Sequence, residues 1–157
     1  MKKHVAPLPL LIHRPTGRAA LIVFAENLLA SDPVFIDKKK YILFIASEKP
    51  VLSSELEEAR RWVDAGVGYM CAWGPASSGL DDLFDFAQFM PELGTPVPFL
   101  LLTTWHDKET LEEALYFAFY DAHPADDLHE VLDSIVMLVD SSDLAERCVA
   151  WVRENSS

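Results

Sequence analysis

Four short apolar runs recur along the chain, and a segment with helical spacing of apolar positions follows each of them. The runs are rich in β-branched and aromatic residues, which is typical of strands buried on both faces. Successive strand-then-helix units imply a parallel sheet, because a right-handed crossover joins parallel neighbours. The pattern predicts a three-layer α/β/α fold with a mostly parallel sheet of at least four strands, Rossmann-like or flavodoxin-like. The predicted strands cover residues 41–47, 67–73, 98–104 and 134–139.

Capping signals place helices between these strands. Ser54 with Glu57 and Thr110 with Glu113 have the spacing of capping boxes, and the last helix is expected to begin at residues 142–143. Apolar positions then predict the buried face of each helix. These positions are Leu56, Ala59 and Val63 in the first helix, Leu80, Leu83, Phe84 and Ala87 in the second, Leu111, Ala114, Leu115 and Ala118 in the third, and Leu144, Cys148 and Trp151 in the last.

The N-terminal segment, residues 1–40, fits this pattern less regularly. Residues 20–25 form an apolar run that predicts either an extra edge strand or part of a short helix, and Pro33 with the lysines at 38–40 marks the boundary. The length of 157 residues fits one domain, residues 1–157, because domains commonly contain ~100–150 residues.

The charge is uneven along the chain. The whole sequence has 25 acidic and 13 basic residues, a net charge of −12, and residues 76–157 contain 17 acidic and only 3 basic residues. Such a negative field disfavours nucleic acid and anionic membranes as partners and favours a basic protein, which it would steer. Solubility alone is the competing explanation, and a homodimer stays open.

Few features indicate a cofactor, a metal or a secretory route. Cys71 and Cys148 lie inside apolar elements, which favours reduced thiols and a cytoplasmic location. No apolar run reaches the ~18 residues of a membrane span. The chain has no Walker pattern, no G-x-G-x-x-G and no G-x-S-x-G elbow, so we expect no cofactor, and no spacing demands a metal.

Trp73, Trp105, His106 and Asp107 stand at the predicted carboxyl ends of two strands, where open parallel sheets bind ligands. The two indoles are expected to lie close together at this edge, with His106 within reach, as a binding face. The alternative is that they cap the core. His106 and Asp107 form a candidate acid–base pair, unless Asp107 only opens the next helix.

The helix expected over residues 110–122 has more apolar surface than one core face needs. At 100° per residue, Tyr116 and Tyr120 point away from the core face and share their side with Glu112 and Glu113. Aromatic residues among carboxylates indicate a protein-binding surface, with tyrosine as anchor and glutamate for steering. The alternative is that the N-terminal forty residues cover them.

The strand-end motifs support a family resemblance. Residues 69–75 (YMCAWGP), the aspartates after them, and residues 103–107 (TTWHD) with 111–114 (LEEA) resemble a small uncharacterised bacterial domain family, a domain of unknown function with paired "CAWGP" and "TTWH" strand-end motifs. The resemblance spans residues 41–140 and implies no activity. Where members often have a cysteine, residues 76–78 read ASS, which argues against a cysteine-based activity. The resemblance implies that Trp73, Asp82, Asp85, Trp105 and His106 form one spatial cluster.

Two hypotheses for the function follow. The first is an acidic, cytoplasmic protein-binding protein, such as an immunity-type inhibitor of a basic toxin or effector, and the absence of a complete catalytic set favours it. The second is an enzyme or small-ligand-binding domain that uses the Trp/His/Asp cluster at the edge of the sheet.

Overall fold

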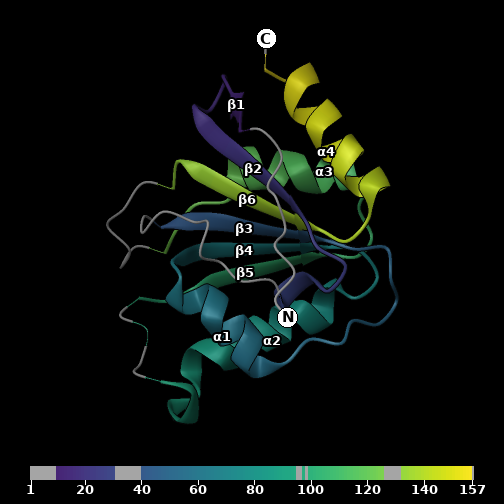
Figure 1. Cartoon of the computed structure of the whole chain (residues 1–157). Coiled ribbons are helices and arrows are strands. Elements are labelled where there is room, and N and C mark those ends of the chain that lie inside the picture. Colours follow the sequence, from purple (N-terminus) through teal and green to yellow (C-terminus); the bar gives the residue numbers. More distant parts are fainter. Residues whose placement is uncertain (1–9, 31–39, 95–96, 98, 126–131, 157) are drawn as a thin grey trace.

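A six-stranded sheet forms the middle layer of the computed structural model, which describes residues 10–30, 40–94, 97, 99–125 and 132–156 (Figure 1). Its order is β1-β2-β6-β3-β4-β5, and β1 pairs antiparallel with β2 while the other neighbours are parallel. The mostly parallel sheet predicted from the apolar runs is thus confirmed. The strands are β1 (Leu11–His13), β2 (Arg18–Phe24), β3 (Tyr41–Ala46), β4 (Val67–Trp73), β5 (Leu102–His106) and β6 (Ser134–Val139).

Helices cover both faces of the sheet, as the three-layer prediction requires (Figure 1). Two of them, α1 (Leu56–Asp64) and α2 (Ser77–Phe89), pack against each other and against one face of β4 and β5. On the opposite face, α3 (Leu111–Tyr116) packs against α4 (Ser142–Glu154), which also covers β1, β2 and β6. Short helical turns are η1 (Leu28–Ala30), η3 (Pro91–Leu93) and the π-helical η4 (Phe117–Asp121).

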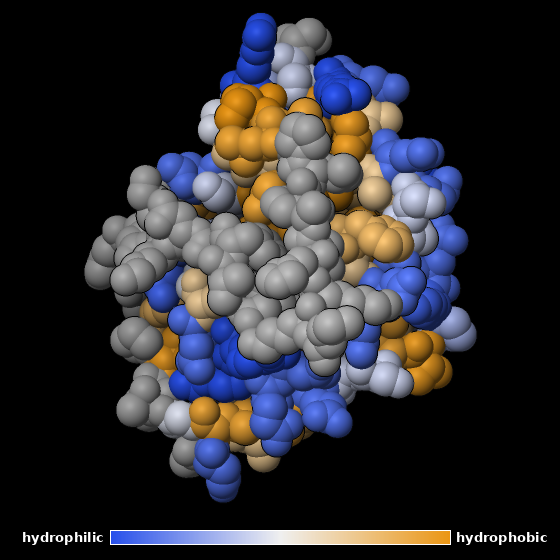
Figure 2. All heavy atoms as spheres, viewed as in Figure 1, coloured by the Kyte–Doolittle hydropathy of each residue, from blue (hydrophilic) through white to orange (hydrophobic). Residues whose placement is uncertain are grey.

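Burial on both faces explains why the strands are continuous apolar runs. All six residues of β3 are buried, and so are the first six of β4 and the last five of β6. The outer faces of the helices contain most of the polar residues. Figure 2 shows hydrophilic side chains along the side of the molecule formed by α4, whereas hydrophobic ones are visible over β1 and β2.

The order of the strands differs from both fold types named above. The parallel strands run β2-β6-β3-β4-β5, which is neither the classic Rossmann order nor the flavodoxin order. From β3 the chain continues outward to β4 and β5, and it then returns so that β6 lies between β2 and β3. The connections from β3 and β6 therefore leave toward opposite sides of the sheet, which makes the crevice between their carboxyl ends the topological switch point.

The N-terminal segment contributes more to the sheet than expected. Residues 18–24 form a strand, but it is interior, since β1 covers one side of it and β6 pairs with the other. Ile22 and Val23 are buried, which an edge position would not require. The boundary expected at Pro33 and residues 38–39 lies outside the described residues.

Two predicted boundaries are wrong by a few residues. The first helix is capped one residue later than expected, because the Glu58 carboxylate accepts a hydrogen bond from the Glu55 amide at 2.9 Å. Strand β5 begins at Leu102 instead of residue 98. Just before it, the Gln88 side chain donates to the carbonyl oxygen of Leu101 and accepts from its amide, both at 2.9 Å, so this apolar segment is satisfied without a strand partner.

The helix after β5 changes from α to π geometry partway along. The Thr110 hydroxyl caps it by accepting from the Glu113 amide at 3.1 Å, as predicted. After Tyr116 the helix widens, and the Ala122 amide donates to the carbonyl oxygen of Phe117, five residues back. Wider turns advance by a smaller angle per residue, so a step of 100° per residue applies only to the first half of this helix.

The side chain of one buried arginine binds the C-terminal end of this helix. The Arg18 guanidinium, from the start of β2, donates to four backbone carbonyl oxygens. Three of them belong to η4 and the residue after it, and the fourth precedes β6. Helix C-termini leave carbonyls unpaired and concentrate negative potential there, so a buried cation stabilises this end of the helix. The four acceptors are the carbonyls of Ala118, Phe119, Ala122 and Leu132.

Replacing Arg18 should therefore destabilise the fold strongly. We expect Arg18→Met to lower the free energy of unfolding by about 3 kcal/mol or more, because buried carbonyl groups lose charged donors. Urea denaturation followed by circular dichroism measures this difference. Arg14→Met, which removes an exposed arginine from the same hairpin, is the control and should change stability by less than about 0.5 kcal/mol. Equal effects of the two substitutions would contradict the role assigned to Arg18.

Candidate functional site

The carboxyl ends of β4 and β5 bring the strand-end residues to one edge of the sheet, as predicted. Trp73 pairs with His106, and Ala72 pairs with Trp105. Because side chains alternate along a strand, this register places Trp73 and His106 on one face and Trp105 on the other. The two tryptophans share an edge but do not form one binding face.

The aspartates of α2 lie on the Trp105 face. The carboxylate of Asp85 accepts a hydrogen bond from the Thr103 hydroxyl at 2.9 Å, and Thr103 and Trp105 are two residues apart on β5. Asp82 is exposed on the same helix, and burial raises the pKa of its neighbour Asp81. The expected single cluster of Trp73, Asp82, Asp85, Trp105 and His106 is therefore divided by the sheet.

His106 is buried and bonds to groups of its own connection. Its Nδ1 lies 2.9 Å from Oε1 of Glu109, and its Nε2 lies 3.1 Å from the Thr104 hydroxyl. Its ring packs against Phe117 with centroids 4.8 Å apart. The carboxylate partner is Glu109 and not Asp107, which is exposed, because three residues allow the chain to turn back whereas adjacent side chains diverge.

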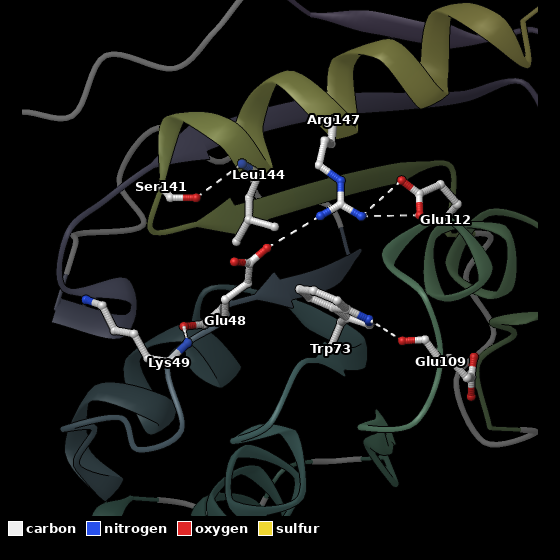
Figure 3. A network of polar contacts seen from close by, with 9 residues as sticks. Glu48, Lys49, Trp73, Glu109, Glu112, Ser141, Leu144 and Arg147 are labelled. Atoms are coloured by element: carbon white, nitrogen blue, oxygen red, sulfur yellow. Dashed lines mark hydrogen bonds and ion pairs between the residues drawn. The ribbon is translucent and has the colours of Figure 1, made fainter.

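A network of polar contacts crosses the same edge (Figure 3). The Trp73 indole donates to the backbone carbonyl of Glu109 at 2.8 Å, which fixes the ring at the end of β4. Arg147 reaches from α4 to Glu112 at 3.2 and 3.3 Å and to Glu48 at 3.4 Å. The sequence alone does not reveal this role of Arg147, because its partners Glu48 and Glu112 are distant in the sequence.

At the topological switch point, a second set of polar contacts joins the segments that follow β3 and β6. The Ser47 hydroxyl, after β3, donates to the Asp140 carboxylate, after β6, at 2.6 Å. Lys49 approaches the same carboxylate at 3.7 Å. Gly74 allows the chain just after β3 to approach closely, since a Cβ at residue 74 would lie 1.8 Å from the Ser47 carbonyl oxygen and the φ of Gly74 is +113°. The groups at this crevice thus bond to one another.

A groove of about 500 Å³ lies between α3 and the C-terminal half of α4. Its acidic lining residues are Glu109, Glu112, Glu113 and Asp121. Its aromatic lining residues are Tyr116, Phe117 and Trp151, and among the described residues no lysine or arginine lines it. The predicted protein-binding residues Glu112, Glu113 and Tyr116 all belong to this groove, which combines negative charge with flat apolar surface.

Tyr116 and Tyr120 differ in their exposure. Their rings stack with centroids 4.5 Å apart, but Tyr116 is 54% exposed whereas Tyr120 is half-buried. The Tyr120 hydroxyl lies 3.4 Å from Nε2 of His13, because the π-helical turn rotates it toward β1. The N-terminal segment therefore covers Tyr120 and leaves Tyr116 to solvent.

His13 packs against aromatic residues that line or adjoin the groove. It is fully buried, stacks on Trp151 with ring centroids 5.5 Å apart, and contacts Phe119 and Tyr120. Its Nδ1 lies 2.7 Å from the Thr16 hydroxyl. Since Trp151 lines the groove and Tyr120 stacks on Tyr116, the position of His13 helps to fix the aromatic surface.

The two cysteine thiols have little reactivity. Burial raises the pKa of the Cys71 and Cys148 thiols to about 12 each, so both stay protonated and are poor nucleophiles. In the described segments, no three metal-ligating side chains lie together. None of the helices in these segments is long and apolar enough to cross a membrane.

The buried imidazole of His13 should make stability depend on pH. Burial lowers its pKa from the ordinary 6.5, and the positive charge of Arg18 lowers it further. The unfolded chain then binds a proton more readily, so the free energy of unfolding should fall as the pH drops below about 6.5 and continue to fall until the folded-state pKa is reached.

Chemical denaturation at a series of pH values, for wild type and His13→Phe, measures this effect. We expect a smaller loss of stability below pH 6.5 in the variant, because phenylalanine cannot bind the proton. His123→Gln removes an exposed histidine and serves as the control, with the wild-type pH dependence. Parallel curves for wild type and His13→Phe would rule out His13 as the source.

Comparison with known proteins places the chain in a family. Neither the curated proteins nor the solved structures contain a match. One family model, described as a domain of unknown function, DUF7684, matches residues 19–155. The match runs from β2 to the end of α4 and so includes the edge cluster and the groove. The resemblance to an uncharacterised domain family is thereby confirmed over a longer segment than 41–140, and the chain belongs to the family of the domain of unknown function DUF7684.

Proposed function

We propose that this chain is an acidic protein-binding protein whose groove between α3 and α4 receives cationic side chains of a basic partner. The observation that supports this most strongly is the composition of the groove, which the described part of the chain lines with four carboxylates, three aromatic rings and no basic residue. A long cationic side chain places its methylene stem on aromatic surface and its charged end among carboxylates. The net charge of −12 adds long-range attraction for such a partner.

The ion pairs of the groove indicate which carboxylates are most available. Arg147 already neutralises much of the charge of Glu112, and His106 contacts Glu109. Glu113 accepts only a neutral hydroxyl, that of Thr110, at 3.1 Å. Asp121 is exposed at the far end of η4. We therefore expect Glu113 and Asp121 to contribute most to attraction of the partner.

Tyr116 is the best-placed anchor residue. It is 54% exposed, lines the groove and is held by its stack on Tyr120, so little conformational entropy is lost when a partner covers it. Guanidinium groups favour such a surface, because they stack on aromatic faces while hydrogen bonding to carboxylates. Arginine should accordingly bind better than lysine.

An immunity-type role, in which the chain inhibits a basic toxin or effector in the cytoplasm, fits these properties. A small acidic domain with one acidic–aromatic groove can cover a basic surface by electrostatic complementarity. The competing hypothesis, an enzyme or ligand-binding domain at the strand ends, has less support. The polar atoms of Trp73 and His106 already bond to Glu109 and Thr104, and Trp105 lies on the other face.

The groove can be tested with a defined probe, a fluorescently labelled peptide of five Arg-Ser repeats, and with its Lys-Ser equivalent. At low salt, Glu113→Gln with Asp121→Asn should lower the association rate constant about tenfold, because steering is lost. Tyr116→Ala should instead raise the dissociation rate constant about tenfold, because anchor contacts form after docking. Stopped-flow fluorescence measures both constants.

Control substitutions distinguish a specific effect of the groove from a general effect of the net charge. Glu57→Gln with Glu92→Gln removes two exposed carboxylates from α1 and η3, and Phe86→Ala removes an exposed ring from α2. Raising the salt toward 0.15 M shortens the screening length to ~8 Å and should reduce only the steering effect. If control and groove variants bind the peptide equally, the groove is a solvated surface and the proposal fails.

A further inference from the structure

In the described part of the chain, strand β5 is an edge of the sheet, and some of its backbone groups have no hydrogen-bond partner. The Gly74 amide donates a hydrogen bond to the carbonyl oxygen of His106. This bond shows which residues of β5 direct their backbone groups toward β4. Alternate residues of β5 therefore bond to β4, and the N–H and C=O groups of Thr103 and Trp105 point away from it. Among the described residues, no hydrogen bond joins these outward groups to a partner.

The backbone N–H and C=O groups of Leu101, just before β5, already have hydrogen-bond partners like those that an added strand would supply. The Gln88 amide group both donates to and accepts from the backbone of Leu101 at 2.9 Å. An antiparallel strand exchanges the same two bonds with its partner residue. Thr103 and Trp105 follow at the next two alternate positions and have no such cover from the described residues. Exposed edges of this kind accept strands from other chains.

The side chains beside this edge favour a particular occupant. Trp105 is 51% exposed, which offers apolar surface to an approaching strand where edge strands commonly place a charge instead. Carboxylates belong to the segments next to this strand: Asp85 on α2 bonds to Thr103, Asp82 is exposed on the same helix, and Asp107 is exposed two residues after Trp105. Lys108 is the one cation of the connection from residue 107 to residue 110. The charge is therefore complementary to basic residues.

We propose that the free edge of β5 accepts an extended, positively charged segment of a partner protein as an additional strand. The segment bonds to the backbone of Thr103 and Trp105, one of its apolar side chains covers the Trp105 indole, and its basic side chains reach the aspartates. A second copy of this chain is the poorer occupant, because each copy has a net charge of −12 and would bring the same aspartates to the interface. The inference does not rest on the groove.

A proline substitution isolates the backbone contribution. Thr103→Pro removes the outward N–H and leaves the bonds to β4 intact, since proline is tolerated on an edge strand where its nitrogen faces solvent. Thr103→Val is the matched control: both variants lose the hydroxyl bond to Asp85, but valine keeps the N–H. Circular dichroism and thermal unfolding of both variants verify that they fold.

The probe is a display library of random twelve-residue peptides, selected on the full-length chain. We expect enriched peptides to have a net positive charge, to bind Thr103→Val like wild type and to bind Thr103→Pro at least tenfold more weakly. N-methylation at alternate peptide residues should abolish binding. Hydrogen exchange at the amides of Thr103 and Trp105 should slow when the peptide binds.

Three outcomes would overturn the inference. The first is enrichment of no peptide at all. The second is equal binding of the enriched peptides to the proline and valine variants, which would place them elsewhere. The third is a concentration-dependent dimer in analytical ultracentrifugation that Thr103→Pro abolishes, because a second copy would then occupy the edge. Glu113→Gln with Asp121→Asn should leave selected-peptide binding unchanged, which separates this test from that of the groove.

Discussion

The buried guanidinium of Arg18 is the interaction on which the face with α3 and α4 depends. A chain that leaves β5 and returns to β6 must end its helix close to the sheet, and the free carbonyls at that end cannot reach water. Arg18 supplies donors to four of them from β2. It thus allows a widened last turn, and this turn decides which aromatic residues face solvent and which face His13. The N-terminal hairpin is for this reason part of the architecture of the groove.

The sequence predicted those features that arise from local periodicity and local capping. The four parallel strands, the Thr110 cap and the buried face of α3 could all be derived from spacing, and so could the association of Glu112, Glu113 and Tyr116. The position of Tyr120 could not, because Tyr120 lies in a π-helical turn whose carbonyl groups bond to Arg18, a residue about a hundred positions away. The interior place of β2 was missed for the same reason, since it depends on pairing with β6.

The strand-end residues lie on two different faces of the sheet, which could not be inferred from their positions at the ends of neighbouring strands. Two parallel strands bring their carboxyl ends to one edge, but the face on which a side chain lies depends on register, and a shift of one residue reverses it. Pairing of Ala72 with Trp105 places the two indoles on opposite faces. The charged groups found at this edge come from the loops after β3 and β6 and from α4, and they bond mainly to one another. The polar groups at the strand ends therefore stabilise the fold, whereas Glu113 and Asp121 of the groove have no ion pair with the described residues.

A short stretch of the chain connects the edge of β5 to the groove. Trp105 ends the open stretch of β5, and Glu109, the first acidic residue of the groove, follows four residues later. His106 joins the two, because its backbone belongs to the β5 ladder while its ring bonds to Glu109. A basic segment paired with β5 would run toward this connection in one of its two directions. A partner that contacts both regions would gain affinity from linkage as well as from charge, because the second contact would form at a high local concentration.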